Sequence, residues 1–333
     1  MIDDALRPPL PLDPTAGAYK DWLHLGVLDP GTGAIGLFNA SLHGSPTDPR
    51  SRAIGTALVH RPDVGWLGNV EVRALEDAAV GSHSIALEQV ALAVDGAADR
   101  VLVSAQMADA GLTASIAATS VARPIDVEQH LPFGPGWISW YVAPRLSLRG
   151  SLELEGERVD LAGAIGYHDH NWGRWHWGDD VGWEWGVMAA ADPDVTIVVS
   201  RTTDRTHRDH GAALVVVESS AGRARFRGPA VDIRLRARYE GGPLRRAPGA
   251  LAALHQDRAT PRLPGRVELT ARDGIDAVEL SFIPRAAAQL IAGDPARRGY
   301  GFVHELVGTF EATLRLNGVR RGLRGPGIFE YVD

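Results

Sequence analysis

Residues 166–186 gather side chains that can do chemistry. The segment reads GYHDHNWGRWHWGDDVGWEWG and holds five of the nine tryptophans, three of the twelve histidines and four carboxylates. Polar groups at consecutive positions are costly to bury without partners, so a run of Tyr, His, Asp, His and Asn is unusual for a core. The segment therefore predicts a functional site, whereas the isolated tryptophans Trp22, Trp137 and Trp140 are interpreted as mainly core residues.

Alternation along a strand would separate these side chains into two sets. If residues 161–170 are extended without a bulge, Ile165, Tyr167 and Asp169 share one face, and His168 and His170 share the other. We expect the face with Ile165 to be the interior. Asp169 would then end an apolar row, with the two histidines flanking it from the opposite side.

A carboxyl group in an apolar pocket has a raised pKa, which makes it a proton donor at neutral pH. Tryptophan faces attract cations without reacting as nucleophiles. Together these groups suit the protonation of an electron-rich alkene and the stabilisation of the carbocation that results. The nearby GWEWG stretch extends the pattern, because it would place Trp183 and Trp185 on one strand face and Glu184 on the other.

Other chemistries find less support in the sequence. His168 and His170 have the i, i+2 spacing of some strand metal sites, with His176 or the His304 and Glu305 pair as further donors. That spacing identifies no full ligand set, so we expect no metal. Neither a Gly-x-Ser-x-Gly elbow nor a phosphate-binding Gly-rich loop is present, and the absence of cysteine excludes thiolate nucleophiles and disulfides.

Charge and composition limit the partners that the sequence predicts. The formal net charge is −7 and the pI is about 5.9, so nucleic-acid binding is not expected. The N-terminal stretch lacks the pattern of a secretory leader, and no window has about 18 uninterrupted apolar residues. We expect a cytoplasmic protein whose membrane contact, if any, is peripheral. The oligomeric state cannot be read from the sequence.

Short, alternating segments between frequent turn residues predict an all-β fold. The chain contains 38 glycines and 21 prolines, and residues 19–28 and 34–44 flank a turn at 29–33 in the pattern of a hairpin. Brief helices are expected only near residues 248–256 and 285–293. We predict two packed antiparallel β domains, sandwich or barrel, covering residues 1–178 and 179–333.

The motif pair resembles a known family. GYHDHNWG, followed by GWEWGVMAAADPDVTIVVSRT, resembles the carotenoid 1,2-hydratase (hydroxyneurosporene synthase) and AttH-like superfamily, which carries an Asp-His/Arg-x-Trp motif ahead of a Gly-Trp-x-Trp strand. The resemblance implies two lipocalin-like β domains, a ligand cavity, and chemistry on terpenoid or polyene substrates without an organic cofactor. The superfamily includes fungal enzymes that perform intramolecular Diels–Alder reactions, and tocopherol cyclase is similar.

The resemblance assigns roles to residues. Asp169 would be the acid, and His168, His170 and Asn171 would tune it or place water. The substrate is expected to contact a mostly aromatic set: Tyr167, Trp172, Trp175, Trp177, Trp183, Glu184, Trp185 and His304.

Three functions follow, all with a hydrophobic small-molecule partner. The leading hypothesis is an enzyme that hydrates or cyclises a terpenoid or polyene alkene by protonation from Asp169. The first alternative is a pericyclase, an intramolecular Diels–Alderase that folds a polyene and lowers the barrier by positioning it. The second is a carrier that binds apolar ligands without catalysis.

Overall fold

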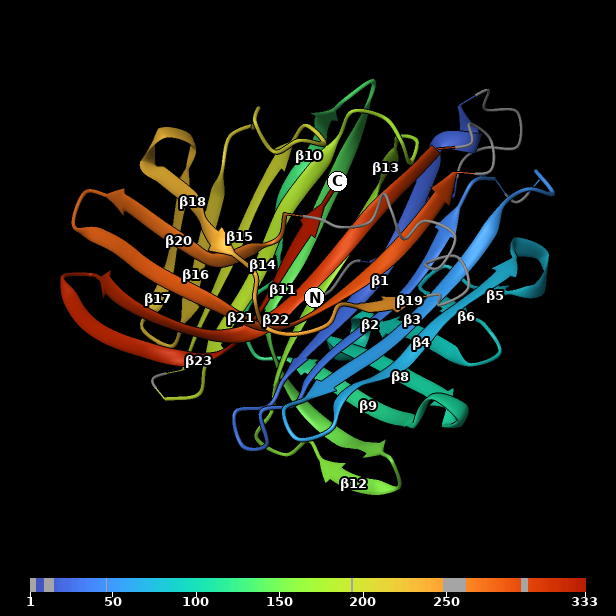
Figure 1. Ribbon diagram of the computed structural model, residues 1–333, viewed down its shortest axis with the longest axis horizontal. Helices are drawn as coiled ribbons and strands as arrows, with labels where there is room; N and C mark the ends of the chain where they lie inside the picture. Colours follow the sequence, from blue (N-terminus) through green and yellow to red (C-terminus); the bar gives the residue numbers. More distant parts are fainter. Residues whose placement is uncertain (1–3, 9–14, 46, 193, 248–261, 295–298) are drawn as a thin grey trace. The chain divides into compact units, whose positions relative to one another are not determined.

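The computed structural model describes residues 4–8, 15–45, 47–192, 194–247, 262–294 and 299–333. These residues form β-strands joined by turns and five short 3₁₀ helices, and no α-helix occurs in these ranges (Figure 1). The 3₁₀ helices are η1 (Ala16–Ala18), η2 (Leu75–Asp77), η3 (Gly96–Ala98), η4 (Ala108–Ala110) and η5 (Gly228–Ala230). The prediction of an all-β protein with two antiparallel sheets is confirmed.

The chain divides into two compact units. The first comprises Met1–Asp179 with Gly293–Gly299, and the second comprises Asp180–Ala292 with Tyr300–Asp333. Each unit is built on its own sheet. The predicted division into residues 1–178 and 179–333 stays a prediction.

The first unit holds a sheet in the order β4-β3-β2-β1-β13-β11-β9-β8-β7-β6-β5, with β10 and β12 paired to β11. Its strands are β1 (Tyr19–Leu28), β2 (Ile35–His43), β3 (Arg52–Arg61), β4 (Gly65–Ala74), β5 (Ala79–Val80), β6 (Ser84–Ala86), β7 (Val90–Asp95), β8 (Arg100–Met107), β9 (Leu112–Ser120), β10 (Ile125–Phe133), β11 (Gly136–Leu154), β12 (Glu157–Asp160) and β13 (Ile165–Arg174). The hairpin expected over residues 19–44 is confirmed as β1 and β2.

The second unit holds a sheet in the order β17-β16-β15-β14-β23-β22-β21-β20-β18, with β19 paired to β21. Its strands are β14 (Gly182–Ala190), β15 (Val195–Thr203), β16 (Leu214–Ser219), β17 (Gly222–Arg227), β18 (Val231–Arg238), β19 (Arg245–Ala247), β20 (Pro264–Asp273), β21 (Asp276–Asp294), β22 (Gly299–Leu316) and β23 (Val319–Val332). The β19–β21 pair is parallel, and the other pairings recorded in this sheet are antiparallel.

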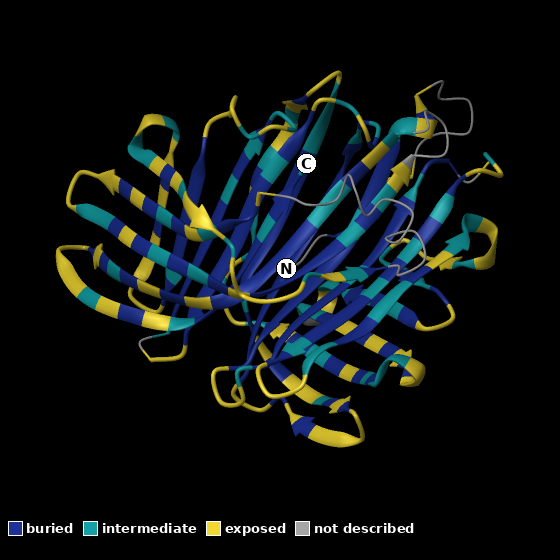
Figure 2. Cartoon of the chain, viewed as in Figure 1, coloured by how far each residue is buried: buried dark blue, intermediate teal, exposed yellow. Residues whose placement is uncertain are grey.

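Burial separates the outlying strands from the central ones. Along β8, buried and exposed residues alternate, which is the pattern of a strand with one face on a core and one in solvent. Along β13, nine consecutive residues are buried, so both of its faces are covered. Figure 2 shows the same contrast between banded and uniformly buried strands. The candidate motif therefore lies on a strand that is shielded from solvent on both sides.

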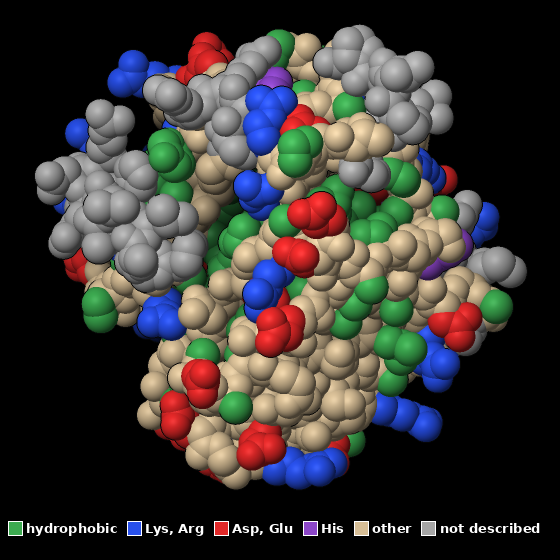
Figure 3. Space-filling model, turned by 90° about the vertical axis from the view of Figure 1, so that its right-hand side faces the viewer, with side chains coloured by type: hydrophobic (Ala, Val, Ile, Leu, Met, Phe, Trp, Pro, Cys, Tyr) green, Lys and Arg blue, Asp and Glu red, His purple; other side chains and the backbone are tan. Residues whose placement is uncertain are grey.

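One of the two expected helices, over residues 285–293, is wrong. Residues 285–293 lie within β21, because extended pairing with neighbouring strands outweighs the helix propensity of an alanine-rich stretch. The other helix prediction, over 248–256, lies outside the described residues. No helix in the described ranges is long and apolar enough to cross a membrane. On the face drawn in Figure 3, acidic and basic side chains are interspersed, and neither sign gathers into a large patch.

Candidate active site

Asp169 lies near the middle of β13, with β1 on one side and β11 on the other. The register places His24 and Val142 directly opposite it on these two strands. Its side chain is only 5% exposed. The Tyr167 hydroxyl donates to Oδ2 over 2.9 Å, and the Asn171 amide donates to Oδ1 over 2.6 Å. Both partners are two residues away, so strand alternation alone puts them on the same face as the carboxyl group.

Cross-strand neighbours complete this side of the sheet, because residues directly opposite on antiparallel strands share a face. Trp22 and His24 on β1 pair with Asn171 and Asp169, and Trp140 on β11 pairs with Asn171. We call this side of β1, β11 and β13 the Asp169 face, defined by Trp22, His24, Trp140, Tyr167, Asp169 and Asn171.

The opposite side of β13 faces the hydrophobic core of the first unit. His168 pairs with Leu25 and His170 pairs with Leu23, and both leucines belong to that core. Trp172 is also a core member, with the Arg7 guanidinium 3.9 Å above its ring. The prediction that Asp169 points toward the apolar interior of its own sheet is therefore wrong. Alternation placed the histidines opposite Asp169 correctly, but the core lies on the histidine side.

Four ionisable side chains form a network on that core side. His168 Nε2 contacts Asp4 Oδ2 at 2.7 Å, and His170 Nε2 contacts Asp21 Oδ1 at 2.7 Å. Asp4 Oδ1 also lies 3.3 Å from His170 Nδ1, so Asp4 bridges both imidazoles. All four side chains are fully buried. Charges at this depth are stable only beside opposite charges, and each imidazole here lies against a carboxylate.

The contacts within this network shift the pKa values of His170 and Asp4 in opposite directions. Both nitrogens of His168 face acceptors, namely Asp4 and the His24 carbonyl oxygen at 2.6 Å from Nδ1. Burial by itself would lower the pKa of His170, but hydrogen bonds and charge from Asp21 and Asp4 raise it to about 9. Burial would raise the pKa of Asp4, but the His168 and His170 contacts lower it to about 2. Asp4 and His170 are therefore both ionised at neutral pH.

The pKa of His24 is lowered, whereas that of His170 is raised. Burial lowers its pKa to about 3, and the charge of His168 acts in the same direction. Its ring lies 6.5 Å from the ring of Tyr167, centroid to centroid. The Asp169 face thus holds a neutral imidazole beside the carboxyl group.

An aromatic cluster continues from the Asp169 face at the end of β13. The ring of Trp175 packs edge-on against Trp22 at 5.5 Å, against Phe133 at 5.3 Å and against Trp177 at 6.2 Å. Lys20, the only lysine in the sequence, is buried with its ammonium 5.1 Å from the Trp175 ring centroid. Trp175 and Trp177 are therefore brought together with Trp22, which sequence reasoning assigned mainly to the core.

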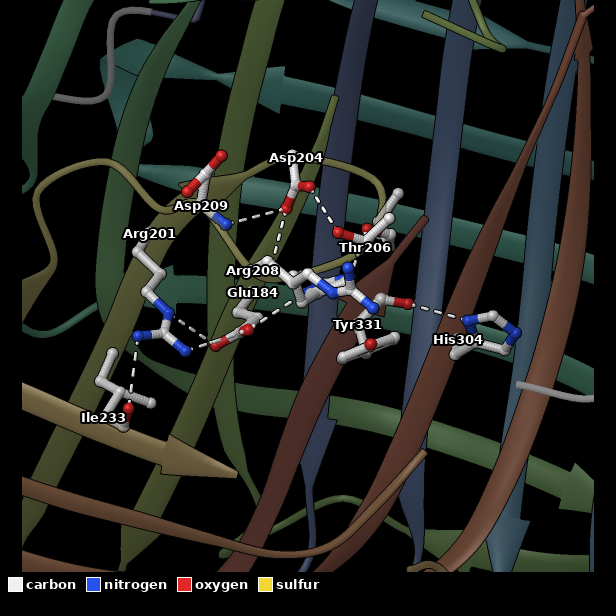
Figure 4. Close-up of polar contacts among 11 residues, drawn as sticks. Glu184, Arg201, Asp204, Thr206, Arg208, Asp209, Ile233, His304 and Tyr331 are labelled. Atoms are coloured by element: carbon white, nitrogen blue, oxygen red, sulfur yellow. Dashed lines mark hydrogen bonds and ion pairs between the residues drawn. The ribbon is translucent and has the colours of Figure 1, made fainter. Parts of the chain in front are cut away.

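The remaining predicted residues lie in the second unit, on two faces of β14 and its neighbours. Trp183 and Trp185 share one face, where the Trp183 indole donates to Glu330. Glu184 is on the other, as predicted, and receives two hydrogen bonds from Arg201 at 2.8 and 3.1 Å. Figure 4 shows this ion pair.

Glu184 and His304 belong to one buried polar network around Tyr331. His207 contacts Glu184 at 3.0 Å and stacks on the Tyr331 ring at 3.6 Å. His304 donates from Nδ1 to the Tyr331 carbonyl oxygen over 3.0 Å (Figure 4). Burial would raise the pKa of Glu184, but the His207 and Arg201 hydrogen bonds lower it; burial lowers that of His304 to about 4. These contacts explain the local structure without a ligand.

His168 and His170 have the spacing of a metal-ligand pair, but the described residues around them do not complete a metal site. In the part of the chain that the structure describes, no group of three or more His, Asp and Glu side chains is arranged to hold a metal ion. Three of the four imidazole nitrogens lie within 2.7 Å of carboxylate or carbonyl oxygens, in the geometry of hydrogen bonds. The expectation of no metal stays a prediction.

Sequence reasoning missed Asp4, Asp21 and His24. Asp4 is 164 residues from His168 in sequence, and Asp21 is 149 from His170. None lies in a motif, so composition gave no signal for them. Knowledge that β1 pairs with β13 would have found Asp21 and His24, because the register puts them beside the motif.

Comparison with known proteins gives structural matches only. No family model matches the chain, and no curated protein matches it in sequence. The crystal structure of a putative AttH from Nitrosomonas europaea superposes with a TM-score of 0.67 at 15% identity, covering 98% of each chain. Kievitone hydratase from Nectria haematococca gives 0.65 at 13% identity, covering 96% of this chain and 90% of that one.

The structure of CghA gives a TM-score of 0.64 at 15% identity, covering 99% of this chain and 96% of that chain. A second CghA structure, with Sch210972, gives 0.61 at 14% identity, with coverages of 99% and 94%. Matches that span both units at such low identity establish a common architecture. The chain therefore has the AttH-like fold that kievitone hydratase and CghA share.

Proposed function

We propose that this protein is an enzyme that protonates a carbon–carbon double bond of a hydrophobic terpenoid or polyene and then hydrates or cyclises it. The observation that supports this most directly is the buried Asp169 carboxyl group, held at both oxygens by Tyr167 and Asn171 on an aromatic face. The AttH-like fold, shared with a protein named as a hydratase, is consistent with the proposal.

The contacts of Asp169 suit a proton donor. Tyr167 can accept as well as donate a hydrogen bond, so its contact with Oδ2 is compatible with either protonation state of the carboxyl group. Asn171 fixes the other oxygen and so fixes the direction of the proton. An alkene carbon placed over this group would receive the proton, and the positive charge would develop at the neighbouring carbon.

Aromatic faces would stabilise that charge. Trp22 and Trp140 flank Asn171 on the neighbouring strands, and an indole face attracts a cation by about 2 kcal/mol when water is excluded. Attack by water on the cation gives an alcohol, whereas attack by a second double bond of the same substrate gives a ring. Both outcomes need the same first step and no external oxidant or reductant.

Exchange of the acid tests the proposal. Asp169→Asn keeps the shape and the hydrogen bonds but cannot donate an acidic proton, so turnover of alkene probes should fall by about 10²- to 10⁴-fold. Suitable probes are farnesol, squalene and 2,6-dimethyl-2-octene, analysed by mass spectrometry in D₂O. Asp126→Asn, at an exposed position on β10, serves as the control and should retain activity.

The isotope result separates the candidate functions. Protonation predicts one carbon-bound deuterium in each product molecule formed in D₂O from a single protonation. An undeuterated cyclic product from a probe that carries a conjugated diene and a second alkene would favour a pericyclase. Full activity in Asp169→Asn would refute the proposal. Mass spectrometry of ligands released from freshly purified, denatured protein is a useful companion, because a ligand that is bound and returned unchanged would favour a carrier.

A further inference from the structure

Hydration of an alkene needs a proton acceptor as well as a donor. One proton goes to carbon, and the water that attacks the cation must lose another. The family resemblance implied that His168, His170 and Asn171 tune the acid or place water. The structure separates those residues, because both histidines lie on the core side of β13 and only Asn171 shares a face with Asp169.

The two network histidines are poorly suited to accept a proton. His168 contacts an acceptor at each ring nitrogen, and His170 has Asp21 at Nε2 and Asp4 beside Nδ1. Both rings are fully buried. A ring nitrogen that already donates to an oxygen has no lone pair left for another proton.

His24 has the position that those histidines lack. It is the β1 residue directly opposite Asp169, and such pairs have Cβ atoms about 4.5–5.5 Å apart on one face. Its ring lies near that of Tyr167, which contacts Asp169 directly. Its backbone is also fixed, since its carbonyl oxygen accepts the short hydrogen bond from His168 Nδ1. His168 therefore fixes the backbone of His24 from the core side of the sheet.

Resting on the proposed function, we infer that His24 is a catalytic residue that accepts the proton of the attacking water, as the partner of Asp169. The substrate alkene takes a proton from Asp169, leaving a carboxylate and a carbocation. Water forms the new C–O bond while His24 takes one of its protons and becomes an imidazolium. Transfer of that proton back to Asp169 restores the enzyme, and the sum is alkene plus water to alcohol.

The order of these steps follows from charge. Before turnover the imidazole is neutral, because burial and the His168 charge lower its pKa, and a neutral ring does not repel the developing carbocation. Once Asp169 has given up its proton, a negative charge stands opposite His24. An adjacent carboxylate favours the imidazolium, so His24 becomes basic at the step that needs a base.

Activity measurements test the role. With squalene, farnesol or 2,6-dimethyl-2-octene in H₂¹⁸O, His24→Gln should lower the rate of ¹⁸O incorporation by about 10²- to 10⁴-fold, whereas probe binding, followed by tryptophan fluorescence, changes little. Added imidazole should restore part of the rate in His24→Ala, which a merely structural role would not allow. His60→Gln, a half-buried histidine on β3, is the matched control and should keep its activity.

The outcomes separate a failure of the His24 role from a failure of the proposed function. Full activity of His24→Gln, with Asp169→Asn inactive, would overturn the role of His24 and leave the proposed function standing. No turnover of any probe by the unaltered protein would overturn both. The ¹⁵N NMR spectrum of labelled histidines gives a substrate-free check, assigned by comparison with His24→Gln. A neutral His24 ring at pH 7 supports the inference, and an imidazolium there would overturn it.

Discussion

The buried network of the first unit should make stability depend on pH above neutrality. The pKa of His170 is about 9 in the folded protein, compared with an ordinary value of 6.5. A group whose pKa is raised by folding stabilises the fold fully below the unfolded value, and this contribution is lost as the pH rises through the folded value. The free energy of unfolding should therefore decline between pH 6.5 and 9.

The size of the decline follows from the same two values. A pKa shift of one unit corresponds to 1.36 kcal/mol, so the rise of the His170 pKa from 6.5 to about 9 corresponds to about 3 kcal/mol. This is a large part of the 5–15 kcal/mol that stabilises a typical protein. The lowered pKa of Asp4 reports the same contacts from the other partner, so it adds nothing to this figure.

Urea unfolding followed by tryptophan fluorescence at intervals from pH 6 to 9.5 measures the effect. The unaltered protein should lose about 3 kcal/mol over this range. His170→Gln should be less stable at pH 6.5 but nearly independent of pH, whereas His60→Gln should keep the decline. A flat profile for the unaltered protein, or an equal decline in His170→Gln, would refute the assignment of His170 as a buried imidazolium.

Two further predictions concern single buried partners. Asp4→Ala should lower the free energy of unfolding in urea by about 3–5 kcal/mol at pH 7, because the buried His170 imidazolium loses a carboxylate and His168 loses a hydrogen-bond partner. A loss below about 1 kcal/mol would contradict the bridging role of Asp4. In the second unit, Arg201→Met should lower the free energy of unfolding by a similar amount, because Glu184 loses both hydrogen bonds from Arg201. The double variant with Glu184→Leu should recover part of that loss, and equal stability of Arg201→Met and the unaltered protein would contradict the prediction.

Local patterns in the sequence were sufficient for much of the fold. The hairpin over residues 19–44 and the strand that carries Tyr167, Asp169 and Asn171 were predictable because strand alternation has a period of two. The same period put Trp183 and Trp185 on one face and Glu184 on the other. The stretch 285–293 was mispredicted because its alanines favour a helix and its strand pairing is non-local.

Some contacts of the candidate site were predictable from the local sequence, and others were not. The contacts of Tyr167 and Asn171 with Asp169 span two residues each, so they follow from the strand alone. Asp4 and His24 reach the motif from the distant N-terminal part of the chain. Such partners depend on which strands pair and in which register. Strand pairing and register are non-local, so no short stretch of the sequence reveals them.

The sequence by itself determined that this protein is all-β and that residues 166–186 hold an unusual density of reactive and aromatic groups. Only the tertiary structure decided which groups face each other. Because β13 is buried on both faces, hydrophobicity could not tell the core side from the other, and the pairing of β1 with β13 settled it. The histidines that looked like Asp169's partners are bound in an ion network, and the imidazole beside Asp169 comes from β1.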